Sequence, residues 1–283
     1  MKVGEAIRII SSSLANIYDE LEAKNIAYMM IGHILNITKI KILSSYDTII
    51  ESDFEEKILK SLDELKTHKP LQYVLGSALF CDCRINVCKD VLIPRPETEE
   101  LVQLIINDHK NKHQKIKILD IGTGSGCIAI ALKKNLPNYE VHAIEISEPA
   151  LLVAKENALN NKTQIFLHHF DVLDTLKWTS VNDFDIIVCN PPYVMESEKV
   201  LMKKNVLDHE PALALFVPND DPLKFYKAVL RFADRYLKSD GMLYFEINED
   251  LAEATAEIFK NREYSNIVIK NDFNGRQRFL TCI

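Results

Sequence analysis

The spacing of apolar residues divides the chain into a helical N-terminal segment and a longer remainder of mixed pattern. From Val3 to about Thr67, apolar residues recur at three- and four-residue steps, and strand-like alternation is missing. Such steps place apolar side chains on one face of a helix. We therefore expect a small bundle of amphipathic helices there, whose apolar stripes form its own core.

The next segment, residues 69–98, is expected to connect this bundle to the rest of the chain. The alternating positions from 71 to 75, and the pattern from 84 to 88, predict short extended stretches closed by turns, including a hairpin. The segment ends in IPRPETE, whose prolines exclude a helix before Thr98. A helix over TEELVQLIIND should therefore start at Thr98.

From Lys115 onward, strand-like and helical segments alternate. The strand-like segments are KIKILDIG, YEVHAIEI, TQIFLHHF, DFDIIVCN, GMLYFEI, NIVIK and RQRFLTCI. Several are continuous apolar runs, as expected of strands buried on both faces. This order predicts an α/β fold with a doubly wound, mostly parallel seven-stranded Rossmann-like sheet, in addition to the N-terminal helical bundle. Too few residues separate the last two strands for a crossover helix, so the last strand should be antiparallel.

Composition narrows the class of protein. The 283 residues are 47% hydrophobic and 27% charged, as in ordinary globular proteins. The formal net charge is −7, so broad attraction to nucleic acid is not indicated. We identify neither a signal peptide nor an apolar run long enough to cross a bilayer. The six cysteines form no C-x-x-C pair, which favours reduced thiols in the cytoplasm over disulfides or a metal site.

The run LDIGTGSGCIAIAL places a glycine-rich turn between a strand and a helix. Gly122, Gly124 and Gly126 would let a ligand approach the backbone closely. About two dozen residues later a second strand ends in Glu145, where an acid typically holds ribose hydroxyls. Asp120, just before the turn, would repel a pyrophosphate, whereas S-adenosylmethionine carries an amino group and a sulfonium. The pattern therefore favours S-adenosylmethionine over a dinucleotide.

A second motif, VCNPPYV, ends the fourth strand of the predicted sheet. Its two prolines cannot continue a central strand. Asn190 therefore lies at the carboxyl edge, where ligands of such sheets bind. Hydrogen bonds from a substrate NH₂ group to the Asn190 side-chain oxygen and the Pro191 carbonyl would orient a poorly nucleophilic nitrogen for methyl transfer. Tyr193 would pack against the planar substrate group. Enzymes that methylate adenine N6, cytosine N4 or protein glutamine all share this motif.

Further segments indicate the family. The chain resembles the release factor glutamine N5-methyltransferases, which are class I S-adenosylmethionine-dependent methyltransferases, in PLQYVLG, LIPRPETEELV, ILDIGTGSGCIAIAL, FDIIVCNPPYV, HEPALALF and NGRQRFL. IPRPETE distinguishes them from relatives that methylate a ribosomal protein's glutamine. The resemblance implies methyl transfer from S-adenosylmethionine to the glutamine of the GGQ motif in class 1 peptide-chain release factors, with S-adenosylhomocysteine as product. Such an enzyme modulates translation termination.

The resemblance also implies an organisation into three parts. Residues 1–68 would be a substrate-recognition domain, 69–98 a connector and 99–283 the methyltransferase domain. We expect a cytoplasmic monomer that binds neither a membrane nor nucleic acid directly. The charged loop ESEKVLMKKNVLDH either contacts the release factor or is a solvated surface.

Individual residues receive roles from the resemblance. The expected cofactor-binding residues are Asp120, Gly122, Thr123, Gly124, Ser125, Gly126, Glu145, Ile146, Asp171, Val172 and Asn190. The expected substrate-binding residues are Asn190, Pro191, Pro192, Tyr193, Arg95 and Glu97, of which Asn190, Pro191 and Tyr193 would be catalytic. In the connector motif, Arg95, Glu97 and Thr98 would help to shape the cofactor pocket, with simple interdomain packing as an equal alternative. The sequence departs from the family at Glu145, where aspartate is usual, and at Phe170 and Val172 beside the expected adenine site.

Three other functions fit parts of the pattern. A ribosomal-protein glutamine methyltransferase or a nucleic-acid amino-methyltransferase would share the strand-end motif. The nucleic-acid enzyme predicts a target-recognition domain and a basic face, neither of which is visible in the sequence. A non-catalytic adaptor would keep the fold, but the intact glycine turn and intact NPPY argue against it.

Overall fold

The computed structural model describes residues 1–110, 115–180, 183–262 and 264–283. The chain divides into two compact units. One consists of Met1–Ser77 with Lys203–His209, and the other of Ala78–Met202 with Glu210–Ile283. Within the described residues, no helix combines the length and the apolar character needed to cross a membrane.

The N-terminal unit is a bundle of helices, as its apolar spacing predicts. Its helices are α1 (Val3–Leu14), α2 (Glu20–Leu35), α3 (Lys39–Ser44), α4 (Ser52–Lys66) and α5 (Leu71–Leu75), with the short α9 (Lys204–Leu207). Ile10, Met30 and Leu65 are fully buried in its core. Asp19 and Thr38 start α2 and α3 by accepting hydrogen bonds from backbone N–H groups of the first turn.

Two predictions for the connecting segment are wrong. Residues 71–75 form the helix α5 instead of an extended stretch; Pro70 precedes it, and Gly76 ends it in the left-handed conformation, at φ 71°. The helix α6 (Pro96–His109) starts two residues before Thr98. Proline is accepted at the first helical position because its missing N–H would have no partner within the helix.

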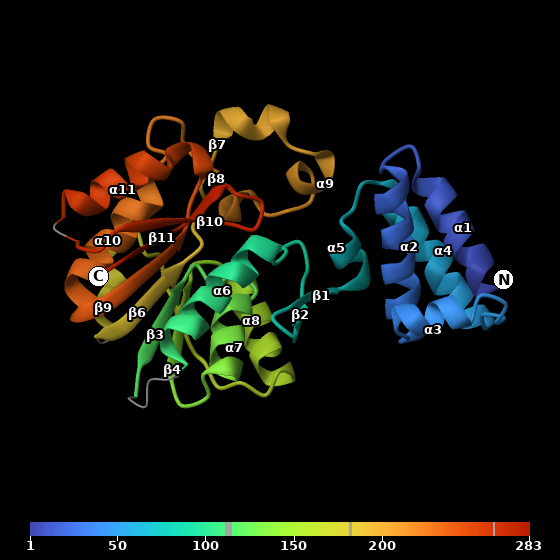
Figure 1. Ribbon diagram of the computed structural model, residues 1–283, viewed down its shortest axis with the longest axis horizontal. Coiled ribbons are helices and arrows are strands. Elements are labelled where there is room, and N and C mark those ends of the chain that lie inside the picture. Colours follow the sequence, from blue (N-terminus) through green and yellow to red (C-terminus); the bar gives the residue numbers. More distant parts are fainter. Residues whose placement is uncertain (111–114, 181–182, 263) are drawn as a thin grey trace. The chain divides into compact units, whose positions relative to one another are not determined.

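The C-terminal unit is built on a seven-stranded sheet of order β10-β11-β9-β6-β3-β4-β5 (Figure 1). Its strands are β3 (Lys117–Ile121), β4 (Glu140–Glu145), β5 (Phe166–His169), β6 (Phe184–Cys189), β9 (Leu237–Glu246), β10 (Val268–Asn271) and β11 (Gln277–Cys282). Pairing is parallel from β5 through β9, and β11 is antiparallel to both of its neighbours. The predicted sheet and its antiparallel last strand are confirmed.

Shorter elements complete the fold. They are β1 (Ser77–Phe80) and β2 (Cys83–Asn86), which form a separate two-stranded sheet; β7 (Val194–Met195) and β8 (Phe216–Val217), which form another; and the 3-10 turns at Thr175–Ser180, Glu196–Leu201, Ala212–Ala214 and Glu249–Leu251.

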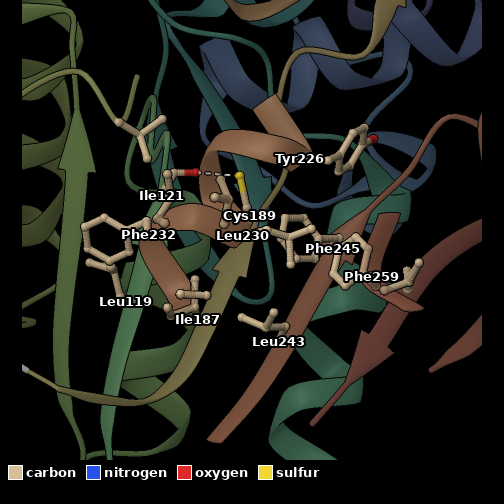
Figure 2. Close-up of a cluster of buried hydrophobic side chains, with 14 of the residues drawn as sticks. Leu119, Ile121, Ile187, Cys189, Tyr226, Leu230, Phe232, Leu243, Phe245 and Phe259 are labelled. Atoms are coloured by element: carbon tan, nitrogen blue, oxygen red, sulfur yellow. Dashed lines mark hydrogen bonds between the residues drawn. The ribbon is translucent and has the colours of Figure 1, made fainter. Parts of the chain in front are cut away.

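Helices cover both faces of the large sheet. The remaining helices of the unit are α7 (Cys127–Asn135), α8 (Glu148–Asn160), α10 (Lys224–Tyr236) and α11 (Ala252–Lys260). Alternate strand residues such as Leu119, Ile187 and Leu243 pack with Phe232 of α10 and Phe259 of α11 in one buried cluster (Figure 2). On the opposite face, α6 and α7 contact the strands. Apolar residues on both faces explain why these strands are continuous apolar runs.

The centre of the sheet is where the chain reverses its direction of winding. From β3 the chain winds outward through β4 to β5, and then returns to β6 on the other side of β3. Ile121, the last residue of β3, pairs with Ile144 on one side and with Cys189 on the other. The Cys189 thiol donates to the Ile121 carbonyl oxygen at 3.1 Å (Figure 2). Open α/β sheets bind ligands outside the carboxyl ends of strands at such a reversal.

Candidate active site

A cavity of about 450 Å³ lies at this reversal point. Its walls are formed by the glycine turn after β3, the end of β4, the loop after β5, the end of β6, the start of α6 and the segment 211–229. This volume is in the range of small-molecule sites. Twelve of the residues predicted for the site contribute to its lining: Arg95, Gly122, Thr123, Gly124, Ser125, Glu145, Ile146, Asp171, Val172, Asn190, Pro191 and Pro192.

The three glycines of the turn play two different parts. Gly122 and Gly124 have φ of +74° and +54°, and a Cβ atom on either would meet no protein atom within 4 Å. Both line the cavity, so their bare backbone faces the space for a ligand. Gly126, at φ +82°, does not line it, and a Cβ atom there would lie 3.1 Å from the Ala154 Cβ. Gly126 therefore allows α7 to pack closely against α8.

The Glu145 carboxylate holds the glycine turn in place and can still accept a hydrogen bond from a ligand. Its Oε2 accepts the Gly124 N–H at 2.8 Å, and its Oε1 accepts the N–H groups of Ile146 and Ser147, both at 2.9 Å. Glu145 is only 7% exposed. A carboxylate oxygen has about two acceptor positions, so Oε2 can accept one further hydrogen bond from a ligand hydroxyl.

Asp120 lies under the turn and outside the cavity lining. It is fully buried, and its Oδ2 accepts the Thr123 hydroxyl at 2.5 Å. Burial raises the pKa of Asp120 to about 7, although the hydrogen bond from Thr123 opposes the rise. Asp120 therefore supports the turn through its hydrogen bond with Thr123 and does not line the space for a ligand.

We expect Asp120 to make stability depend on pH. Its folded-state pKa of about 7 lies above the ordinary value of 3.8, so the folded chain keeps a proton that the unfolded chain releases. The free energy of unfolding should therefore fall by on the order of 3 kcal/mol as the pH rises from about 4 to 7. In Asp120→Asn this loss should be absent, as measured by urea unfolding at several pH values. Asp240→Asn, at an exposed position, is the control; parallel pH profiles for Asp120→Asn and wild type would contradict the assignment.

The residues of the NPPY motif that follows β6 do not all line the cavity. Asn190, Pro191 and Pro192 line the cavity, and the Asn190 Nδ2 donates to the Thr98 Oγ1 at 3.1 Å. Tyr193 does not line the cavity, and its hydroxyl donates to the Glu246 Oε1 at 2.9 Å. The packing of its ring against the substrate stays a prediction.

The segment IPRPET is tied to the cavity wall by a buried acid. The Arg95 guanidinium donates to the Glu210 Oε1 at 2.5 Å, and the Ile93 N–H donates to the Glu210 Oε2 at 3.1 Å. The Glu210 side chain is 1% exposed. Glu97 does not line the cavity; burial raises the pKa of the neighbouring Glu246, and the charge of Glu97 adds to that rise. Arg95 thus shapes the wall as part of a fixed ion pair.

Sequence reasoning missed two acids of this region. Glu210 belongs to the quoted run HEPALALF but received no role, and Glu246 ends the strand GMLYFEI. For Glu246 the available signal was an acid at the carboxyl end of a central strand, the same signal that singled out Glu145; Glu210 ends no strand and gave no such signal. Phe170, which the sequence flagged as a departure from the family, lines the cavity with Asp171, Val172 and Leu173.

The sheet, the glycine turn and the NPPY strand end together define a methyltransferase. In agreement, the family model described as "Methyltransferase small domain" matches residues 98–211. The fold is also that of the crystal structure of a methyltransferase from Pyrococcus furiosus, at TM-score 0.52 and 18% identity, over 82% of this chain and 98% of that one.

The remainder of the chain and its close relatives specify the family further. The model described as "PrmC N-terminal domain" matches residues 5–76. The release factor glutamine methyltransferase of Flavobacterium psychrophilum is 41% identical over 270 residues, which are 95% of this chain and 94% of the relative. That of Bacteroides thetaiotaomicron is 40% identical over 96% of this chain and 97% of its own length. The chain belongs to the release factor glutamine methyltransferase family.

Proposed function

We propose that this protein transfers a methyl group from S-adenosylmethionine to the side-chain nitrogen of the glutamine in the GGQ motif of class 1 peptide-chain release factors. The observation that carries the proposal is the shared cavity: the bare glycine backbone, the Glu145 carboxylate and the Asn190 amide all line it. The relatives' names supply the substrate class. The reaction would take place in the cytoplasm, with the protein acting as a monomer.

The cavity suits S-adenosylmethionine in shape and charge. Gly122 and Gly124 leave room beside the backbone, and the Glu145 Oε2 can accept a hydrogen bond from a ligand hydroxyl. The carboxylates of Asp90, Glu145 and Asp171 are among the lining residues, and they would attract an amino group and a sulfonium. The apolar side chains of Phe170 and Val172 would flank a purine ring. When bound, S-adenosylmethionine supplies an electrophilic methyl group on its sulfonium.

The role of the strand end is to orient the substrate nitrogen. An amide nitrogen is a weak nucleophile because its lone pair is delocalised into the carbonyl group. The Asn190 Oδ1 and the Pro191 carbonyl would each accept one N–H of the substrate amide, which directs the nitrogen toward the methyl group. In the transfer, the nitrogen would gain the methyl group as the carbon–sulfur bond of the bound S-adenosylmethionine breaks, and one amide proton would leave to solvent. Such positioning supplies most of the rate in an in-line transfer.

The test is a labelling experiment. The purified protein is incubated with radiolabelled S-adenosylmethionine and either a full-length class 1 release factor or duplex DNA, and labelled peptides are identified by mass spectrometry. We expect label on the GGQ glutamine. A release factor with alanine in place of that glutamine is the control and should stay unlabelled. Label on DNA, or on neither substrate although the cofactor binds, would contradict the proposal.

A further inference from the structure

A chain of hydrogen bonds connects a buried carboxylate to Asn190. Glu246 is the last residue of β9 and is 2% exposed, and Thr98 lies in the first turn of α6 and is 3% exposed. The Thr98 Oγ1 lies 2.7 Å from the Glu246 Oε2 and 3.1 Å from the Asn190 Nδ2. Three segments that are far apart in the sequence thus meet at one hydroxyl group.

Because Thr98 has one hydroxyl proton, it is possible to say which group donates in each of these hydrogen bonds. An ionised carboxylate only accepts, so Thr98 must donate its single hydroxyl proton to Glu246. The Thr98 oxygen can then only accept, and the sole donor on the Asn190 side chain is its Nδ2. The amide is therefore held with Nδ2 on Thr98 and with Oδ1 on its other side. A reversed amide would place two acceptors against each other.

The hydrogen-bond partners of Glu246 stabilise its ionised form against the effect of burial. The Tyr193 hydroxyl donates to its Oε1 at 2.9 Å, so both carboxylate oxygens have a hydroxyl donor. Burial is the largest influence and leaves the pKa of Glu246 raised, and the charge of Glu97 adds to the rise, whereas these two hydrogen bonds and the positive charge of Arg278 oppose it. Glu246 is thereby linked to both ends of the NPPY motif, directly through Tyr193 and by way of Thr98 to Asn190.

We propose that Glu246 and Thr98 are positioning residues that fix the Asn190 amide with its Oδ1 available to the substrate, and so select a substrate group that bears N–H donors. The inference rests on the proposed function. An Oδ1 in this position accepts from the NH₂ of glutamine. It would oppose the carboxylate of glutamate, which has only acceptors. The Glu246 carboxylate thus determines the preference for glutamine over glutamate at the Asn190 Oδ1, although it does not contact Asn190.

The decisive variant is Thr98→Val, which removes the hydroxyl and keeps the shape of the side chain. Without that hydroxyl, the Asn190 amide loses the partner that sets its orientation. We expect kcat on the release factor to fall by roughly 10²-fold, the size of effect that misplacement of a reacting group produces. The dissociation constant of S-adenosylmethionine, measured by calorimetry, should stay within about three-fold of wild type, because the turn and Glu145 are unchanged. Thr98→Ser, which restores the hydroxyl, should recover most of kcat.

A matched control distinguishes this effect from the cost of removing a buried hydroxyl. Thr255 is fully buried in α11, and its hydroxyl has no hydrogen-bond partner among the described residues. Thr255→Val should leave kcat unchanged. A second readout is competition by short peptides: GGQ should compete better than GGE against the wild-type enzyme, and Thr98→Val should narrow that difference.

The outcomes separate this inference from the proposed function. If wild-type enzyme does not label the GGQ glutamine, the proposed function fails. If it does, and Thr98→Val keeps both its kcat and the GGQ preference, the positioning role is wrong. Should Thr98→Val fail to bind cofactor, Glu246→Gln decides by the same criterion. A glutamine there has one acceptor oxygen for the two hydroxyls of Thr98 and Tyr193, so a kcat equal to wild type would refute the inference.

Discussion

Turnover in Asn190→Ala is expected to fall by roughly 10²- to 10³-fold, the loss seen when one preorganised hydrogen-bonding group is removed from an active site. The reason is geometric. Asn190 follows the last residue of β6 and lines the cavity, and its side-chain amide donates to Thr98. Without it, the substrate nitrogen keeps at most the Pro191 carbonyl as a guide. Steady-state kinetics with labelled S-adenosylmethionine and a release factor would measure the change.

The affinity for S-adenosylmethionine should stay within a few-fold of wild type in this variant, because the glycine turn and the Glu145 carboxylate do not depend on Asn190. Asn135→Ala is the matched control, since Asn135 is an exposed residue at the last position of α7 and its amide donates to the Ala131 carbonyl oxygen of the same helix. Near-normal turnover in Asn190→Ala would mean that the nucleophile is oriented by other groups.

The second large effect is expected at the glycine turn, where Gly124→Val should weaken binding of S-adenosylmethionine by more than about 100-fold. A Cβ at position 124 meets no protein atom within 4 Å, and Gly124 lines the cavity, so the added methyl groups occupy space intended for the ligand. The backbone φ of +54° adds strain of roughly 1–2 kcal/mol for a side chain with a Cβ. Calorimetric titration with the cofactor would measure the loss.

Gly275→Val separates the two causes. Gly275 has φ +80° and equally open surroundings, but it lies in the turn between β10 and β11 and does not line the cavity. This control should show the backbone strain as a lower melting temperature while it binds the cofactor normally. If Gly124→Val also bound the cofactor normally, the ligand would have to lie elsewhere than beside the turn.

Local patterns were sufficient to predict the sheet and the two turns that line the cavity. Continuous apolar runs identified the central strands, and the glycines after β3 and the prolines after β6 marked where those strands end. The same reasoning failed for residues 71–75, because five residues are too few to distinguish a helical period from alternation. There the flanking Pro70 and Gly76 decide the conformation.

The contacts behind the site could not be predicted in the same way. Glu246 bonds Thr98 across 148 positions of the chain, and Glu210 bonds Arg95 across 115. Neither pairing leaves a local signal, because any of the chain's acids could accept from these donors. Tyr193 shows the same limit, because nothing local in the motif indicates that its hydroxyl donates to Glu246.

The separate cores of the two units have a consequence for how the protein loses its structure. One hydrophobic cluster is drawn entirely from residues 3–71 and another entirely from residues 119–282. Chains with more than one domain commonly depart from all-or-none unfolding, and a single melting temperature then averages over distinct events. The stability changes at Asp120 and Gly124 belong to the C-terminal cooperative unit. They should be followed with a probe inside it, such as the fluorescence of Trp178, the chain's one tryptophan, which is buried in the second cluster.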